Sequence, residues 1–209
     1  MAQTGQAGAV DMSWLSVLLG LERVNVLAFE AEIVAGLPAN PIGLRQCGMP
    51  FASLGLSSPL VRVAAEFGFE IPTPIQAQAI PVVLEGRDVL GLAQTGSGKT
   101  GAFALPILDR LLRSRLSTPK RLQALVLVPT RELASQVGEV FSQFALALPT
   151  RTRVAVLYGG VSINPQMMRL RGGADVVVAT PGRLLDLVQN NALRLGQVQH
   201  LVLDLADRL

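Results

Sequence analysis

Apolar and polar positions alternate in two distinct rhythms along most of the chain. Apolar residues that recur every three to four positions predict helices over Ser57–Phe67, Pro74–Leu84, about 98–113, Arg131–Leu146, about 164–171 and 181–189. Short continuous apolar runs between them predict buried strands at Asp88–Leu92, Ala124–Val128, Val154–Leu157, Val176–Ala179 and Leu201–Leu203. Strands that alternate with helices form βαβ units. The pattern therefore predicts an α/β fold with a parallel sheet flanked by helices.

The first 48 residues differ from the rest in charge. They contain two arginines and four acidic residues, whereas residues 49–209 contain 16 basic and 11 acidic residues, and the Pro/Gly-rich stretch Gly36–Gly43 lies near the boundary. We interpret residues 1–48 as an N-terminal extension outside the core and residues 49–209 as the folded domain. The extension has two possible interpretations. It forms a short amphipathic helix around residues 12–35, or it is a translated upstream segment, with Met49 as an alternative start. Its apolar stretch has no basic flank and is shorter than a membrane span of about 20 residues, so we expect no signal peptide and no membrane partner.

Composition narrows the classes of protein that fit. Half of the residues are apolar and 16% are charged, which excludes an intrinsically disordered chain. The single cysteine, Cys47, excludes a disulfide framework and, with His200 as the only histidine, argues against a zinc site. Sixteen of the 18 basic residues are arginine, a side chain suited to bidentate phosphate contacts. A net charge of +3 is equally typical of an ordinary arginine-rich surface.

The segment that follows the strand Val89–Leu92 is typical of a phosphate-binding loop. Its residues are Ala93, Gln94, Thr95, Gly96, Ser97, Gly98, Lys99 and Thr100. Glycines allow successive backbone N–H groups to converge on phosphate oxygens, and the following helix adds its positive N-terminal end. Lys99 would reach the β and γ phosphates, Thr100 would offer its hydroxyl to Mg²⁺, and without phosphate we expect Lys99 to point into solvent. A chance Gly-rich turn is the alternative, and Ala93 stands where the general pattern has glycine.

Further short segments follow in a specific order and spacing. They are Phe51, Gly68–Gln76, Ala93–Thr100, Pro129–Ala134, Gly159-Gly160, Thr180–Arg183 and Val202–Asp207. In these segments the chain resembles the first RecA-like domain of DEAD-box RNA helicases of bacterial type, over essentially all of residues 49–209. Alanine at position 93 is normal in that family. The resemblance implies a RecA-like P-loop NTPase fold, ATP and Mg²⁺ as cofactors, RNA as a partner and a cytoplasmic location.

The same resemblance implies an adenine site upstream of the phosphate loop. It assigns ATP contacts to Phe51, Phe69 and Gln76, with Phe51 stacked on the base. The Gln76 amide could pair with both the N6 amine and N7 of adenine. From the residues alone, Phe51 fits a core aromatic and Gln76 fits an amide on a helix surface. The Gln76 segment also argues against an unrelated P-loop NTPase, such as a DNA-directed helicase.

Three loops that follow strands are the RNA-binding candidates that the resemblance implies. Because ligands bind at the carboxyl ends of parallel strands, these loops should share one edge of the sheet. The family uses them on the sugar-phosphate backbone without reading base sequence. Ordinary helix caps and turns are the alternative. The candidate residues are Pro129, Thr130, Arg131, Gly159, Gly160, Thr180, Pro181, Gly182 and Arg183.

The chain departs from the family at its acidic motif. The family reads Asp-Glu-Ala-Asp, whereas this chain reads Asp204-Leu205-Ala206-Asp207. Asp204 can still hold Mg²⁺, and Lys99, Asp204 and Asp207 are the catalytic candidates. Leu205 stands at the position of the glutamate that orients and deprotonates water, so we expect binding to survive and hydrolysis to be largely lost. An error at one codon is the competing explanation.

The end of the sequence carries a further expectation. A family member continues through a Ser-Ala-Thr segment, further strands and a second RecA-like domain. The resemblance therefore implies that residues 49–209 are an incomplete domain, without its C-terminal strands, and that a second RecA-like domain is its partner. A non-catalytic nucleotide- or RNA-binding fragment is the alternative to the enzyme.

Overall fold

The computed structural model describes residues 25–30, 50–94, 96–114 and 121–205. Within them, six strands form one sheet in the order β2-β1-β6-β3-β5-β4, and every neighbouring pair is parallel. This arrangement confirms the predicted parallel α/β fold. The strands are β1 (Asn25–Glu30), β2 (Val89–Leu92), β3 (Ala124–Leu127), β4 (Val154–Leu157), β5 (Val176–Ala179) and β6 (His200–Asp204).

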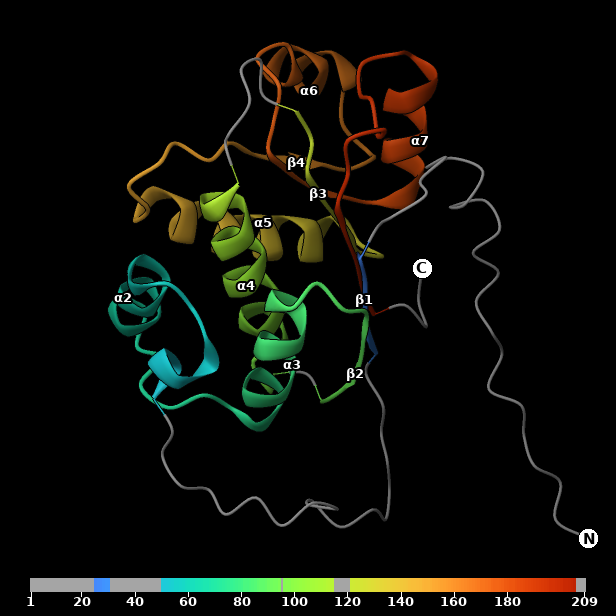
Figure 1. Cartoon of the computed structure of the whole chain (residues 1–209). Helices are drawn as coiled ribbons and strands as arrows, with labels where there is room; N and C mark the ends of the chain where they lie inside the picture. The colour runs from blue at the N-terminus through green and yellow to red at the C-terminus, as the bar shows by residue number, and fades with distance from the viewer. Residues whose placement is uncertain (1–24, 31–49, 95, 115–120, 206–209) are drawn as a thin grey trace, which may run out of the picture.

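Helices cover both faces of this sheet. Figure 1 shows α2 to α5 together on one side and α6 and α7 on the other. The bounds of α2 to α7 lie within a few residues of those that the apolar spacing predicts, whereas the short helix η1 was not predicted. They are η1 (a 3₁₀ helix, Phe51–Leu54), α2 (Ser58–Glu66), α3 (Pro74–Leu84), α4 (Lys99–Arg113), α5 (Arg131–Leu146), α6 (Ile163–Leu170) and α7 (Pro181–Gln189).

Alternate residues of the central strands divide the core into two layers. On β3, Val126 packs into the cluster that contains α2, α3, α4 and α5, whereas Leu125 and Leu127 pack into the cluster that contains α6 and α7. Successive side chains of a strand point to opposite faces, so both faces must be apolar when both are covered. This is why the strands appear in the sequence as continuous apolar runs.

The strand β1 was not predicted. It lies between β2 and β6, and Leu27 at its centre is fully buried. The structure therefore differs from two expectations for residues 25–30, namely that they lie outside the core and that they belong to an amphipathic helix. The physical reason is that parallel partners on both sides satisfy the backbone of β1, and Leu27 packs into the core layer that contains α2 to α5. For the other residues of the segment 1–48, the domain boundary stays a prediction.

None of the helices among the described residues has both the length and the apolar character needed to cross a membrane.

Candidate functional site

The phosphate loop connects β2 to α4, as the sequence predicts. Gly96 and Gly98 both have positive φ, at 80° and 92°, a backbone region that favours glycine. Gly98 is also the N-cap of α4, so the loop passes directly into the N-terminus of this helix. A Cβ atom at Gly98 would lie 2.7 Å from Nε2 of Gln76. Glycine is therefore needed here for two reasons, the backbone angle and the close approach of α3. Thr95 lies outside the described residues.

Lys99 folds back over the loop. Its side chain is buried, and Nζ donates a hydrogen bond of 2.7 Å to the carbonyl oxygen of Ala93. The expectation that Lys99 points into solvent is wrong. The carbonyl oxygen of Ala93 accepts a hydrogen bond from the ammonium group, which water would accept if the side chain were exposed. Displacing this contact would free the ammonium group for phosphate oxygens in the same loop.

Asp204 lies at the carboxyl end of β6, and its side chain is buried. Burial raises the pKa of this carboxyl group, and the positive charge of Lys99 opposes that rise. Oδ1 of Asp204 has no hydrogen-bond partner among the described residues. A buried carboxylate oxygen without a partner is costly unless a cation or donor joins it, so the site suits a bound ion.

The oxygen atoms around the loop fit Mg²⁺, which prefers oxygen ligands and retains several waters. Asp204 offers its unpaired Oδ1, and Ser97 Oγ likewise has no partner among the described residues. Thr100, in the first turn of α4, is half-buried. That Asp204 and Thr100 would hold the ion stays a prediction from the sequence.

Leu205 follows Asp204 in a left-handed backbone conformation with φ of 57°. Its side chain is buried and aliphatic. It offers no atom that could accept a proton from water. Asp207, the other acidic candidate of this motif, lies outside the described residues.

Gln76 joins α3 to the phosphate loop. Its Oε1 accepts a hydrogen bond from the backbone N–H of Thr73 at 3.0 Å, and its Nε2 donates to the carbonyl oxygen of Gly98 at 3.1 Å. The side chain is buried, so the reading of Gln76 as an amide on a helix surface is wrong. An adenine base could therefore bind the Gln76 amide only by sharing it with the carbonyl oxygen of Gly98 or by breaking the hydrogen bond between them.

The two aromatic candidates for the adenine site differ in position. Phe51 is 3% exposed and stacks on Phe69, with ring centroids 6.2 Å apart. Phe69 is half-buried, and its ring edge lies 3.4 Å from where a Cβ atom on Gly101, in the first turn of α4, would stand. In this conformation Phe51 is a core aromatic and is covered, so it does not face a base directly. Phe69 is the aromatic side chain nearer the phosphate loop.

The three RNA-binding candidate loops follow β3, β4 and β5 at one edge of the sheet. Thr130 caps α5 by accepting a hydrogen bond from Leu133 N at 3.3 Å. Arg131 is exposed and pairs with Glu132, and this hydrogen-bonded contact raises the pKa of Arg131 and lowers that of Glu132. The structure gives open space where side chains at Gly159, Gly160 and Gly182 would stand. Pro129, Thr180 and Pro181 are half-buried at the same edge.

Arg183 differs from the other RNA-binding candidates because it is buried. Its Nη2 donates a hydrogen bond of 2.7 Å to the carbonyl oxygen of Val161, and its Nε lies 3.6 Å from Asp186 Oδ2. It therefore connects α7 to the loop after β4. The sequence interpretation of Arg183 as a phosphate-binding cation missed this internal contact, since burial cannot be inferred from a single charged position.

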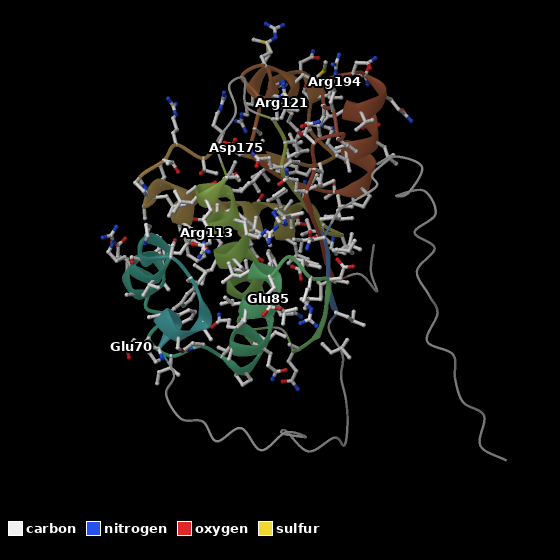
Figure 2. The ribbon with its side chains drawn as sticks, viewed as in Figure 1. Glu70, Glu85, Arg113, Arg121, Asp175 and Arg194 are labelled. Atoms are coloured by element: carbon white, nitrogen blue, oxygen red, sulfur yellow. The ribbon has the colours of Figure 1, made fainter. Side chains whose placement is uncertain are left out.

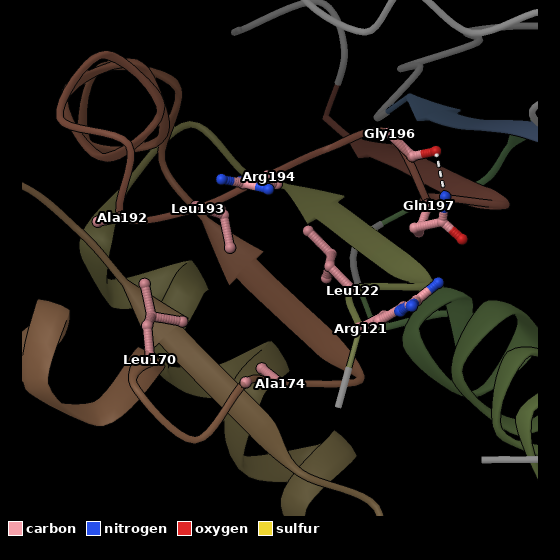
Figure 3. A pocket seen from close by; sticks show the side chains of 10 residues that line it. Arg121, Leu122, Leu170, Ala174, Ala192, Leu193, Arg194, Gly196 and Gln197 are labelled. Atoms are coloured by element: carbon pink, nitrogen blue, oxygen red, sulfur yellow. Dashed lines mark hydrogen bonds between the residues drawn. The ribbon is translucent and has the colours of Figure 1, made fainter. Parts of the chain in front are cut away.

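A pocket of about 530 Å³ lies away from all of these residues. Leu122, Ala174 and Gln197 line it, from segments that precede β3, β5 and β6 and so lie at the opposite edge of the sheet. Arg121 and Arg194 also line this pocket, as Figure 3 shows, and both side chains are labelled in Figure 2. No candidate site residue lines this pocket.

The loop, the buried lysine and the buried aspartate define the class of protein as a P-loop nucleotide-binding domain. A model of the DEAD/DEAH box helicase family matches residues 73–209. The chain is 49% identical over 159 residues to "ATP-dependent RNA helicase DeaD" of Escherichia coli, covering 76% of this chain and 24% of that protein. It is 48% identical over 160 residues to "Probable ATP-dependent RNA helicase DDX47" of Mus musculus, covering 76% of this chain and 34% of that protein.

A solved structure agrees with these sequence matches. The crystal structure of the yeast DEAD-box splicing factor Prp28 superposes with a TM-score of 0.71 at 38% identity, covering 78% of this chain and 39% of that one. The chain belongs to the DEAD/DEAH box helicase family, as a DEAD-box domain with a RecA-like fold. The resemblance stated from the sequence is thereby confirmed. The chain spans about a quarter of the length of the first of these curated relatives and about a third of the length of the second.

Proposed function

We propose that this domain binds ATP with Mg²⁺ and the backbone of RNA, as the ATP-binding part of a cytoplasmic RNA helicase that couples hydrolysis to duplex unwinding. The observation that supports it best is the phosphate loop beside a buried carboxylate. Gly98 begins α4, Lys99 is held over the loop, and Asp204 Oδ1 has no partner among the described residues. Together they offer backbone donors, a cation and a metal ligand.

Each group has a separate task in nucleotide binding. The loop N–H groups and the N-terminus of α4 would bind phosphate oxygens, and Lys99 would exchange the Ala93 carbonyl for a phosphate oxygen. Thr100 and Asp204 would hold Mg²⁺, which neutralises phosphate charge when bound. Gln76 and Phe69 would contact the adenine, with Gln76 already joined to the loop through Gly98.

Nucleotide binding can be tested by comparing ADP and GDP. We expect ADP with Mg²⁺ to bind more tightly than GDP, and Gln76→Ala to weaken ADP more than GDP because the adenine edge loses its partner. Gln78, exposed on the same helix, provides the control variant Gln78→Ala. Equal affinities for ADP and GDP in the unchanged chain would contradict adenine recognition.

RNA binding would use the exposed loops after β3, β4 and β5. The space beside Gly159, Gly160 and Gly182 is open, so the RNA backbone could approach these loops closely. Arg131 supplies an exposed positive charge. We expect Arg131→Ala to weaken single-stranded RNA binding and reduce its salt dependence. The control is Arg194→Ala, which removes one positive charge at the opposite edge of the sheet. Equal effects of the two variants would indicate non-specific attraction only.

Hydrolysis should be poor, because Leu205 provides no acceptor for a proton from water. A positioned base contributes about 10²–10⁴-fold in rate. A non-catalytic nucleotide- or RNA-binding role is therefore the second candidate function, and Leu205 is the observation that favours it.

The two candidate functions can be separated in one experiment. This chain is joined to the downstream part of a related helicase, with either leucine or glutamate at position 205. We expect both forms to bind ATP and RNA, and the glutamate form to hydrolyse ATP about 10²–10⁴-fold faster. Equal rates would mean that water is activated by another group.

A further inference from the structure

The edge of the sheet opposite the nucleotide site is strongly basic. Four segments lead into the amino ends of β3, β4, β5 and β6, and together they contain six arginines and one acidic residue, Asp175. Asp175 is fully buried and accepts a hydrogen bond of 2.8 Å from the backbone N–H of Arg153, so it leaves no carboxylate on this surface. The segments are residues 121–123, 149–153, 167–175 and 190–199.

Two adjoining pockets open at this edge. The larger one, of about 530 Å³, is lined by leucines and alanines from the segments before β3, β5 and β6. The smaller one, of about 470 Å³, lies beside α6 and shares Leu170 and Ala192 with the larger one. Figure 3 shows Leu122, Leu170 and Leu193 around the larger pocket. Concave, mainly apolar spaces of this size are typical of binding sites.

Three exposed arginines stand around the two pockets. Arg121 and Arg194 line the larger pocket, and Arg171 lines the smaller one. None of the three forms an ion pair with a residue that the structure describes. A guanidinium group presents a planar fork of N–H donors that matches a carboxylate, and arginine is enriched in protein interfaces. The edge therefore offers positive charge that no described carboxylate neutralises.

The smaller pocket adds an exposed apolar wall. Met167 and Met168 line it, and Met168 is 56% exposed on α6. Methionine is flexible and polarizable, and it is common on surfaces that adapt to the side chains of different peptides. The described residues that line the two pockets include no aromatic side chain. Because single-stranded RNA is commonly bound by stacking its bases on aromatic rings, the lining favours a peptide over RNA.

We propose that this edge binds an acidic segment of a partner protein, with apolar side chains in the two pockets and carboxylates at Arg121, Arg171 and Arg194. Burial of the apolar side chains would supply affinity, and bidentate hydrogen bonds to the carboxylates would fix the orientation of the segment. The partner would lie at the amino ends of the strands, whereas the proposed nucleotide and RNA contacts lie at the carboxyl ends. Both edges could therefore be occupied at the same time.

The chemistry of the partner can be tested by selection from a phage-displayed library of random dodecapeptides on the full chain. We expect the selected sequences to be enriched in aspartate and glutamate together with leucine, isoleucine or methionine. The most frequent selected peptide, labelled with fluorescein, then serves as the probe in anisotropy titrations. A selection that yields no peptide above background, or peptides without this acidic and apolar composition, would overturn the proposal.

The contacts can be tested with variants of the full chain. We expect Arg121→Ala and Arg194→Ala each to weaken probe binding about 10-fold, as the loss of a hydrogen bond between charged groups commonly does. Gly196→Leu should also weaken it, because Gly196 lines the larger pocket and a Cβ atom there would meet open space. The matched control is Arg62→Ala, which removes an exposed arginine from α2 and should leave the affinity unchanged. Equal affinities in the arginine variants and the control would contradict the proposed contacts.

Two other occupants would be revealed by the same variants. If single-stranded oligouridylate displaces the probe and binds more weakly to Arg121→Ala and Arg194→Ala than to Arg62→Ala, the edge is an RNA surface and the proposal is wrong. If light scattering shows a dimer of the unchanged chain that Arg194→Glu abolishes, a second copy covers the pockets and the proposal is equally wrong. These measurements need no nucleotide, so their outcome is independent of the proposed nucleotide site.

Discussion

Replacing Gln76 should show that the nucleotide loop is held by α3 before any ligand binds. Gln76→Ala removes two hydrogen bonds, one from Thr73 N and one to Gly98 O. At about 1 kcal/mol each, they predict a loss of about 2 kcal/mol in the free energy of unfolding, and more if the buried partners stay unpaired. The matched control is Gln78→Ala, an exposed amide two residues further along the same helix.

The variant Gln76→Glu separates the two bonds. A carboxylate can still accept from Thr73 N, but it cannot donate to Gly98 O and would repel that carbonyl. We therefore expect a loss of stability at least as large as in Gln76→Ala, because a buried carboxylate that faces a carbonyl oxygen is costly, together with weaker ADP binding. The assays are urea unfolding followed by circular dichroism and ADP titration calorimetry. Unfolding free energies of Gln76→Ala and Gln78→Ala that agree within error would refute the reasoning.

Three further predictions concern other parts of the fold. Lys99→Ala should leave the chain folded and weaken ADP binding about 10- to 100-fold in calorimetry, because the loss of a hydrogen bond to a charged group commonly has an effect of this size. Unchanged affinity would contradict the phosphate-loop assignment. Burial, with a smaller contribution from Arg110, lowers the pKa of His200 to about 4 from 6.5. The unfolded chain therefore binds more protons between these values, and stability should fall by about 2 kcal/mol from pH 7 to pH 5, a loss that His200→Gln should lack in urea unfolding. Gly138→Ala should destabilise by about 1–3 kcal/mol, since its Cβ would collide with Val156 Cγ2; Val156→Ala in the same chain should recover part of this, and additive losses would argue against the contact.

Most of the fold could be predicted because its signals are local. The helix α5 begins at Arg131, where Thr130 provides the cap, and β3 is a run of apolar residues with both faces covered. The strand β1 could not be predicted, because its six residues form a strand by pairing with β2 and β6, which lie far along the chain. Its contact to Asp88, for example, spans 62 positions.

The candidate site divides in the same way. The strand, turn and helix around Gly98 are encoded in adjacent residues, so the loop between β2 and α4 lies where the sequence predicts it. Burial is a property of the whole fold, and sequence reasoning misjudged it at Gln76, Lys99 and Arg183. Each of these polar side chains contacts a loop carbonyl from the inside. A single position in a sequence does not reveal such a contact.

These internal contacts change how the site should be understood. Lys99 and Asp204 are buried and carry opposite charges, and the positive charge of Lys99 counters the rise in the Asp204 pKa that burial causes. Removing the lysine would therefore also make the carboxylate easier to protonate and a poorer metal ligand. A loss of Mg²⁺ affinity in Lys99→Ala does not require a direct contact between the lysine and the metal. Lys99 and Asp204 are thus electrostatically coupled, so a substitution at Lys99 also changes the carboxyl group of Asp204.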